Sequence, residues 1–98
     1  MINIFEITDK TGRKIRLTKR QWQHITKYHK YMTNYLEEIK EALISPIKIT
    51  ESLYDENVSY YFKYLKHAAY SKKYLLVAVR YLNGKGFIIT AYLETNIK

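Results

Sequence analysis

The only proline of this chain, Pro46, separates two stretches in which apolar residues have different spacings. Between Leu17 and Pro46 they recur at intervals of three and four residues, which predicts helices; after Pro46 they alternate with polar residues, which predicts strands. Proline lacks a backbone N–H and disfavours a helical conformation in the residue before it, so Ser45 and Pro46 should end the last helix. We therefore expect the helices before Pro46 and most of the sheet after it.

The first helix has a start signal at Thr18. Gln21 follows at the spacing of a capping box, in which the Thr hydroxyl and the Gln side chain each satisfy a free backbone donor. Leu17 and Trp22 have the spacing of a hydrophobic staple, an apolar contact that fixes the direction in which the chain enters a helix. The helix should begin directly after Thr18 and run to about His29.

The other elements follow from periodicity and turn residues. A β-hairpin that turns at residues 9–12 precedes the first helix, and a second helix is expected from Asn34 to the stop at Pro46. Four strands joined by hairpin turns follow, at Ile47–Leu53, Val58–Leu65, Tyr74–Leu82 and Phe87–Leu93. We predict an α+β fold in which an N-terminal β-hairpin and two helices pack on a four-stranded antiparallel sheet.

Composition limits the class of protein. The 98 residues are enough for a single domain, spanning 1–98, and an apolar content of 47% favours a folded chain. There is no cysteine to form a disulfide. No apolar run approaches the roughly 18 residues that cross a membrane, and the N-terminus lacks a signal-peptide pattern. We expect a soluble cytoplasmic protein without membrane contact; its oligomeric state has no readable signal.

The charge pattern favours a nucleic-acid partner. The net charge is +8, and eleven tyrosines are present. Cations attract phosphate and tyrosine rings stack on unpaired bases, so the combination indicates single-stranded nucleic acid. The alternative is a solvated basic face with tyrosines as strand-forming core residues. Between Asn57 and Leu93 the chain has no acid and six cations: Lys63, Lys66, Lys72, Lys73, Arg80 and Lys85.

The histidines do not form a metal-binding pattern. His24 and His29 are five positions apart and therefore do not share one helical face, as two ligands spaced four apart would. His67 has no nearby ligand pattern. We expect no metal and no other cofactor.

RNA cleavage is chemistry that these residue types can perform without a metal. The ribose 2′-OH is the nucleophile, so the protein must supply a base, an acid, and positive charge or hydrogen-bond donors for the phosphate. Histidine titrates near neutral pH and can act as acid or base. The alternative for each histidine is a packing or capping role. The candidate catalytic residues are His24, His29, Lys63, Arg80, Thr90 and Tyr92, and the candidate substrate-binding residues are Tyr61, Lys66, Lys72 and Lys73.

Whether the strand residues of this set share a face is left open. Thr90 and Tyr92 point to one face of their strand. Arg80 joins them or faces away according to the register of the last hairpin, since a shift of one residue reverses the face. The loop His67–Lys73 is polar and is a further candidate for ligand contact.

A series of short motifs also resembles a known family: Ile15-Arg16-Leu17-Thr18, Trp22-x-His24-Ile25, His29, Pro46-Ile47, Tyr60-Tyr61, Tyr74 to Val79, and Ile89-Thr90-Ala91-Tyr92. Their order is similar to that of the phage-associated small nuclease domains of the BECR superfamily, named for barnase, EndoU, colicin and RelE. The resemblance covers Ile15 to Tyr92. It implies helices followed by a four-stranded antiparallel sheet, metal-independent RNA cleavage, and a toxin or phage-borne effector restrained by an antitoxin or immunity protein.

Carried over by position, His24 and His29 match the histidine-bearing segment of that family, and Thr90 with Tyr92 match its terminal strand. Lys63 and Arg80 are looser matches, chosen for their charge on the middle strands. Family members often have His-Pro-Glu where this chain has His29-Lys30-Tyr31. Without that Glu, the role of general base passes to histidine.

Two main hypotheses follow. The first is a metal-independent endoribonuclease that cleaves single-stranded RNA and acts as a toxin or phage-borne effector. The second is a non-catalytic RNA- or DNA-binding module that uses the same basic, Tyr-rich face. A third possibility is a protein whose basic surface meets an acidic protein. If an antitoxin or immunity partner exists, it should be acidic and cover the surface from Lys63 to Lys85.

Overall fold

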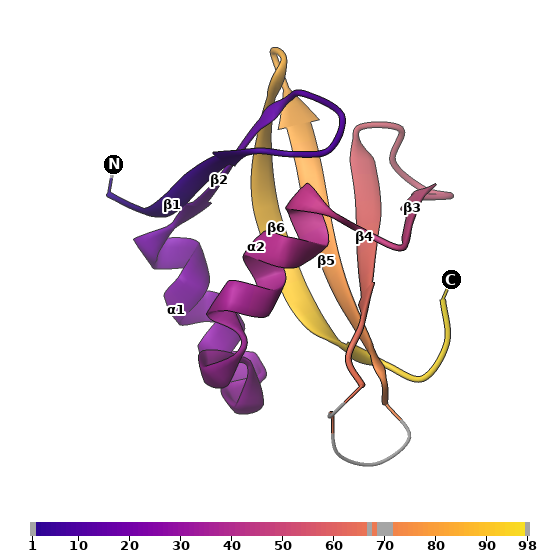
Figure 1. Ribbon diagram of the computed structural model, residues 1–98. Helices are drawn as coiled ribbons and strands as arrows, with labels where there is room; N and C mark the ends of the chain where they lie inside the picture. The colour runs from indigo at the N-terminus through magenta and orange to yellow at the C-terminus, as the bar shows by residue number, and fades with distance from the viewer. Residues whose placement is uncertain (1, 67, 69–71, 98) are drawn as a thin grey trace.

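The computed structural model describes residues 2–66, 68 and 72–97 (Figure 1). Its helices lie before Pro46, as predicted, and most of its sheet lies after it. The elements are, in chain order, β1 (Asn3–Thr8), β2 (Lys14–Thr18), α1 (Lys19–Tyr28), the 3₁₀-helix η1 (Lys30–Asn34), α2 (Leu36–Ile44), β3 (Lys48–Glu51), β4 (Val58–Tyr64), β5 (Tyr74–Leu82) and β6 (Lys85–Glu94). No helix in the described ranges is long and apolar enough to cross a membrane.

The prediction of a separate hairpin on a four-stranded antiparallel sheet is wrong. The fold is α+β, but its sheet is mixed and six-stranded, in the order β1-β2-β6-β5-β4-β3. Strands β3 to β6 are antiparallel neighbours, whereas β2 runs parallel to β6, pairing Ile15 with Gly86 and Arg16 with Phe87. A Cβ on Gly86 would lie 2.8 Å from Ile15 Cγ1, so the missing side chain gives Ile15 the space that it occupies. Alternation of apolar and polar residues predicts that a segment is a strand, but not which strand of the sheet it pairs with.

The two faces of the sheet have different surroundings. Figure 1 shows α1 and α2 on one face, here called the helix face, where β-strand residues such as Tyr61 and Val77 join the larger apolar cluster with Ile39 and Leu43 of α2. The opposite face, here called the open face, is covered by none of the described helices. A smaller cluster lies there, with Phe62, Leu76 and Ala78 at its centre and Tyr60, Tyr74, Ile89, Tyr92 and Ile97 packed against it.

Helix α1 starts as predicted, although only half of the expected capping box forms. The Thr18 hydroxyl accepts a hydrogen bond from the Gln21 backbone N–H at 3.1 Å. The Gln21 side chain instead donates to the carbonyl oxygen of Ile89 on β6. In the described structure β2 pairs with β6 only at Gly86 and Phe87 and does not extend to Ile89. The Gln21 side chain of α1 therefore supplies a hydrogen-bond donor to the Ile89 carbonyl oxygen, which β2 does not reach.

The start of the second helix differs from the prediction. Residues from Lys30 to Asn34 form the 3₁₀-helix η1, and α2 begins at Leu36 rather than at Asn34. Its N-cap residue, Tyr35, makes no side-chain capping bond, and Glu37 pairs with Lys40 at 3.1 Å. The helix ends at Ile44, directly before Ser45 and Pro46, as predicted.

Candidate functional site

The hairpin between β5 and β6 determines which polar side chains share the open face. Its turn is Asn83-Gly84, with positive φ angles of 53° and 78°, as hairpin turns of two residues require. Arg80 pairs with Phe87, and a register shift follows, after which Ala78 pairs with Thr90.

That register shift brings Arg80, Thr90 and Tyr92 to one face. Without it, a turn of two residues would direct Thr90 and Tyr92 away from the face that holds Arg80. The extra residue of β6, Ile89, reverses the alternation, so Thr90 and Tyr92 lie opposite Ala78 and Leu76 on the open face.

His29 reaches this face from the end of α1. Its ring stacks on Tyr92, with centroids 5.4 Å apart and an interplanar angle of 26°, and Tyr31 meets the other ring edge-on at 6.0 Å. The Tyr31 hydroxyl accepts a hydrogen bond of 3.4 Å from the Leu93 backbone N–H. Together with the Gln21 contact, this bond fastens both ends of the α1–η1 segment to β6 and so holds His29 beside Tyr92.

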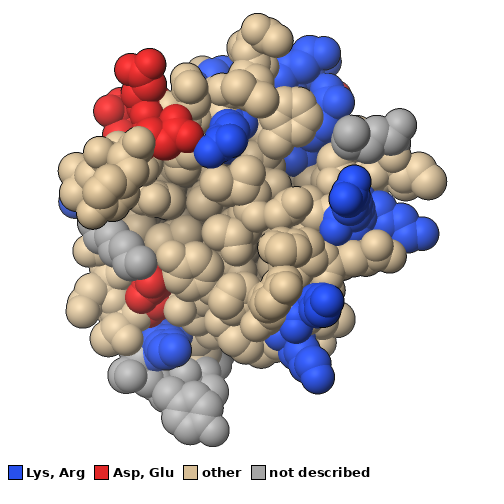
Figure 2. All heavy atoms as spheres, turned by 180° about the vertical axis from the view of Figure 1, so that it is seen from behind, with Lys and Arg blue, Asp and Glu red and all other residues tan. Residues whose placement is uncertain are grey.

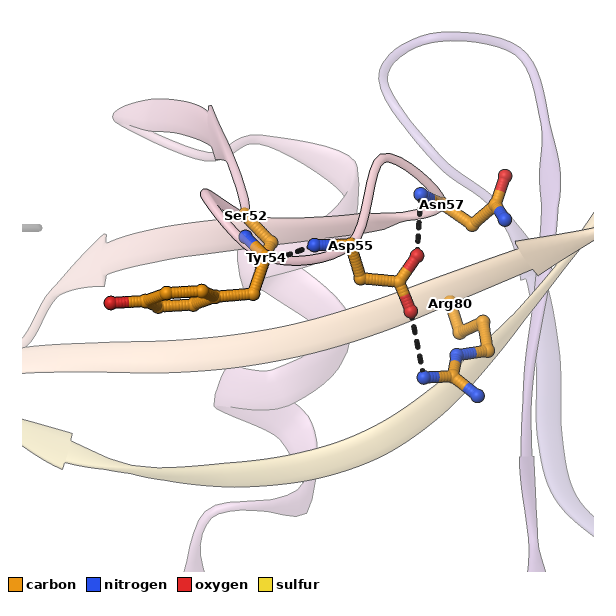
Figure 3. A network of polar contacts seen from close by, with 5 residues as sticks. All are labelled: Ser52, Tyr54, Asp55, Asn57 and Arg80. Carbon is orange, nitrogen blue, oxygen red and sulfur yellow. Dashed lines mark hydrogen bonds and ion pairs between the residues drawn. The ribbon is translucent and has the colours of Figure 1, made fainter.

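Arg80 is held by the loop between β3 and β4 (Figure 3). Its guanidinium lies 2.9 Å from Asp55 Oδ2, while Asp55 Oδ1 accepts from the Asn57 N–H at 2.9 Å. Ser52 Oγ accepts from the backbone N–H groups of Tyr54 and Asp55, which orders the start of the same loop. A guanidinium has five N–H donors, so this one contact leaves others of the half-exposed Arg80 for a phosphate.

Three other candidates lie elsewhere. Lys63 is on the helix face, with its ammonium 3.0 Å from Glu41 of α2. Tyr61 is fully buried on the same face and cannot contact a ligand at the surface. His24 is exposed on α1, with its ring 4.8 Å from that of Tyr28. The structure therefore places Arg80, Thr90 and Tyr92 on the open face with His29 at its margin, without Lys63 or Tyr61. Arg80 is four residues along β5 from Leu76, the partner of Tyr92, which is a separation of about 13 Å along the strand.

The other candidate lysines, Lys66, Lys72 and Lys73, flank the end of β4 and the start of β5. Lys66 and Lys72 are exposed, and the ammonium of Lys73 donates to the Ala68 carbonyl. Lys63 and Lys66 line an open hollow of about 490 Å³ beside Tyr64. Most of the loop His67–Lys73, predicted to contact a ligand, lies outside the described residues.

The sequence pattern marked Asp9 only as a turn residue, but its carboxylate is the centre of a buried polar cluster. It accepts hydrogen bonds from the hydroxyls of Tyr61 and Tyr81, from the Thr11 hydroxyl and from the backbone N–H groups of Thr11 and Arg13. The Arg13 guanidinium lies 3.5 Å from the Tyr81 ring centroid. The local turn contacts are typical of Asp-x-Thr sequences, whereas the long-range tyrosine contacts left no signal in the pattern.

The cluster shifts the pKa of each of its acids. Burial alone would raise the pKa of Asp9, but hydrogen bonds from Tyr61 and Thr11, with help from Arg13, outweigh it and hold that pKa below its usual range. Burial, and then the hydrogen bond to Asp9, raise the pKa of Tyr61 well above its usual value. Burial also raises the pKa of Tyr81. The cluster therefore holds one carboxylate and two neutral phenols across the ordinary pH range.

Comparison with known proteins identifies the family. The family model of the phage-Barnase-EndoU-ColicinE5/D-RelE like nuclease2 matches residues 5–97. The chain belongs to this family. No significant match was found among the curated proteins or the solved structures compared with it. The match supports a nuclease of the BECR superfamily and a nucleic-acid substrate.

In this BECR nuclease the open face suits a polyanion that carries aromatic bases. Figure 2 shows the molecule from behind: residues other than Lys, Arg, Asp and Glu fill the middle of the face, and cations lie around its upper, right-hand and lower margins. Acidic side chains gather at the upper left of the same view. Among the described residues no group of three or more His, Cys, Asp or Glu side chains is placed to hold a metal ion.

Proposed function

We propose that this protein is a metal-independent endoribonuclease that cleaves single-stranded RNA through the ribose 2′-OH. The observation that carries the proposal is the His29 ring stacked on Tyr92, at the margin of the face that also holds Arg80 and Thr90. A group able to transfer protons, a cation and two hydroxyls are thus assembled on one surface, which is what transesterification of RNA requires.

In the proposed reaction the 2′-oxygen attacks the adjacent phosphorus while His29 accepts the 2′-OH proton. The bond from phosphorus to the 5′-oxygen breaks, and that oxygen takes up a proton as it leaves. The products are a 2′,3′-cyclic phosphate and a free 5′-OH. The hydroxyls of Thr90 and Tyr92 donate hydrogen bonds to the phosphate oxygens on which charge develops. Arg80, about 13 Å along β5 from the partner of Tyr92, binds a neighbouring phosphate of the same strand. Asp55, which holds Arg80, keeps the guanidinium in one place for this contact.

The leaving oxygen needs an acid, and His24 is the second histidine of the proposal. It lies five residues before His29 on α1 and is exposed to solvent. Because the two histidines are on different sides of the helix, the proposal requires the RNA strand to cross α1 between them. Lys66, Lys72 and Lys73 are proposed to bind phosphates further along the strand. As a toxin or phage-borne effector, the protein would be restrained by an acidic antitoxin or immunity partner that covers the open face.

The test is cleavage of a labelled single-stranded RNA in the presence of EDTA, next to the same strand with 2′-deoxyriboses. We expect cuts only in RNA and products that end in cyclic phosphate. Full activity in a His24→Ala, His29→Ala double variant would remove the mechanism. Ile44→Ala is the matched control, because Ile44 is an exposed side chain of α2 that has no part in the site.

The alternative is a binding module that holds RNA or DNA without cutting it. The tyrosines of the open face, Tyr60, Tyr74 and Tyr92, favour it, because aromatic rings stack on bases whatever the chemistry nearby. Binding that weakens with salt, with no cleavage at any pH between about 5 and 8, would support this alternative over the nuclease, since each bound phosphate releases counterions.

A further inference from the structure

A second feature of the open face lies on β3, β4 and the loop between them. A pocket of about 380 Å³ is lined there by Thr50 and Glu51 of β3, Leu53 and Tyr54 of the loop, and Tyr60 of β4. Leu53 and Tyr54 are 92% and 95% exposed, and as neighbours at the rim of the pocket they form one exposed apolar patch. None of the residues proposed for RNA cleavage lines this pocket.

Thr50 provides an independent indication that the pocket takes a ligand. Its hydroxyl oxygen is buried, and within the described part of the chain it has no hydrogen-bond partner. Buried polar atoms in proteins nearly always have a partner, since an unpaired hydroxyl has lost its water without compensation. Because Thr50 lines the pocket, rotation of its side chain would turn the hydroxyl toward a ligand there, and a ligand with a hydrogen-bonding edge would supply the missing partner.

The lining indicates which chemical group fits. Tyr54 and Tyr60 offer aromatic surface, and Thr50 offers a group that can both donate and accept. No cation lines the pocket, so nothing in it would neutralise a phosphate. An uncharged aromatic ring with polar edges, such as a nucleobase, satisfies these conditions, and unpaired bases are commonly stacked on aromatic side chains and hydrogen-bonded at their edges.

Sheet register connects this pocket with the proposed cleavage site. Thr50 pairs with Tyr60, Tyr60 with Ala78, and Ala78 with Thr90, so these residues form one row across the open face. Four adjacent strands span about 14 Å at a spacing of ~4.8 Å, which places the pocket and Thr90 within reach of one short RNA segment.

The loop that carries Tyr54 also holds Arg80, the proposed phosphate ligand, through Asp55. Figure 3 shows the Asp55 carboxylate directed toward Arg80 and the Tyr54 ring directed away from it. The loop therefore fixes the pocket relative to Arg80.

We propose that the pocket formed by Thr50, Tyr54 and Tyr60 binds one unpaired nucleobase of the RNA substrate, next to the phosphate that Arg80 contacts. The proposal rests on the proposed function for the identity of the ligand, and it adds a subsite that stacking and a hydroxyl contact define. Because the ring of a paired base is stacked within a duplex, this subsite would select single-stranded over double-stranded RNA.

The first test is a double-mutant cycle between Tyr54 and individual bases. The probe is a fluorescein-labelled hexanucleotide of adenosine with 2′-O-methyl riboses, which cannot be cleaved through the 2′-oxygen, and binding is followed by fluorescence anisotropy. Tyr54→Ala should weaken binding by about 5- to 150-fold, the range for loss of one base stack. Ile44→Ala, exposed on the other face, is the control and should bind as the wild type does.

Removing the base at each position of the probe in turn identifies the base that occupies the pocket. At one position the wild type should lose affinity while Tyr54→Ala loses none, because the same contact has already been removed. Equal losses in both proteins at every position, or unchanged binding by Tyr54→Ala, would overturn the subsite. If the protein binds RNA through Tyr54 but cuts none, the proposed cleavage is wrong and the subsite stands. If it cuts RNA and the binding does not depend on Tyr54, the subsite is wrong and the proposed cleavage stands.

Thr50→Val separates a ligand contact from a structural role. Valine has nearly the same shape but no hydroxyl, so the free protein should keep or gain thermal stability when the unpaired oxygen is removed. Binding of the hexanucleotide should nevertheless fall several-fold. Unchanged binding in Thr50→Val would show that the hydroxyl has no ligand and would contradict the proposed hydrogen bond.

Discussion

The Asp9 carboxylate should contribute a large share of the stability of this fold, and Asp9→Ala tests its contribution. The variant removes the acceptor of the Tyr61 hydroxyl and of three hydrogen bonds within the turn, from the Thr11 hydroxyl at 2.7 Å, the Arg13 N–H at 2.9 Å and the Thr11 N–H at 3.0 Å. Among the described residues, the Tyr61 hydroxyl then keeps its contact with Tyr81 and no other hydrogen bond.

The expected loss can be estimated from these contacts. Hydrogen bonds to charged groups contribute about 1.5–3 kcal/mol each and are not additive, and each buried donor left without a partner costs about 1–3 kcal/mol. We therefore expect Asp9→Ala to lower the free energy of unfolding by about 3–5 kcal/mol. For a domain of this size that corresponds to a fall in Tm of at least roughly 12 °C.

Urea denaturation followed by circular dichroism measures this loss directly. Glu6→Ala is the matched control, because Glu6 is an acid of the same hairpin whose pairing with Arg16, at 3.4 Å, lies at the surface. Such exposed pairs contribute about 0–1 kcal/mol. A loss below about 1 kcal/mol in Asp9→Ala, equal to that of the control, would refute the large contribution to stability expected of the Asp9 carboxylate.

The pH dependence of stability provides a second measurement on the same group. Because the folded-state pKa of Asp9 lies below its usual value, its contribution is complete above the unfolded carboxyl pKa of about 3.9 and is lost as the pH falls through the lower, folded-state value. The wild type should therefore lose stability below about pH 4, and Asp9→Asn should lose less over the same interval. Parallel curves for the two proteins would contradict this assignment.

Three further predictions follow from the same structure. His29→Ala should lower the rate of RNA cleavage by at least about 100-fold, the usual contribution of a proton-transfer group, and His24→Ala by less; equal rates for His29→Ala and the wild type would remove His29 from the mechanism. Gly86→Ala should reduce stability by about 1–3 kcal/mol in urea denaturation, because the new methyl group would lie 2.8 Å from Ile15 Cγ1, and a neutral effect would contradict the close approach of β2. The pKa of Tyr61 is raised in the folded state, so stability should be complete below the usual phenol pKa of about 10 and fall as the pH rises above it, and Tyr61→Phe should flatten that decline.

Local sequence signals predicted the elements well where one short segment determines the outcome. Thr18 caps α1 with its own side chain, and Pro46 ends α2 through its missing N–H, so both boundaries depend on a few neighbouring residues. Gln21 was predicted less well, because its side-chain amide could accept from the Thr18 backbone N–H or donate to a carbonyl oxygen, and the carbonyl that it contacts, on β6, lies far away in sequence. The parallel pairing of β2 with β6 depends on the close approach of Ile15 to Gly86, where a side chain would not fit. The two residues are far apart in sequence, so no local pattern predicts this contact.

The candidate site was predictable in residue type but not in arrangement. His29, Arg80, Thr90 and Tyr92 were identified by their chemistry, whereas their common face depends on one extra residue, Ile89, that reverses the alternation of β6. Lys63 was chosen for its charge on a middle strand, and the parity of β4 directs it to the helix face instead. Irregularities of this kind arise from the packing of whole strands, and a period-2 pattern does not contain them.

The same parity changes the meaning of the acid-free run between Asn57 and Leu93. Consecutive residues of a strand point to opposite faces, so cations that are close in sequence do not form one surface. Lys63 is paired with Glu41 on the helix face and Arg80 with Asp55 on the open face, and both acids come from outside the run. A single partner that covers all of Lys63 to Lys85 would therefore have to wrap around the sheet. A partner or an RNA strand that stays on the open face would contact Arg80 but not Lys63. Asp55 already neutralises part of the Arg80 charge, so RNA binding on the open face should depend on shape and stacking as well as on charge. The tyrosines of that face should therefore contribute more to this binding than the net charge of +8.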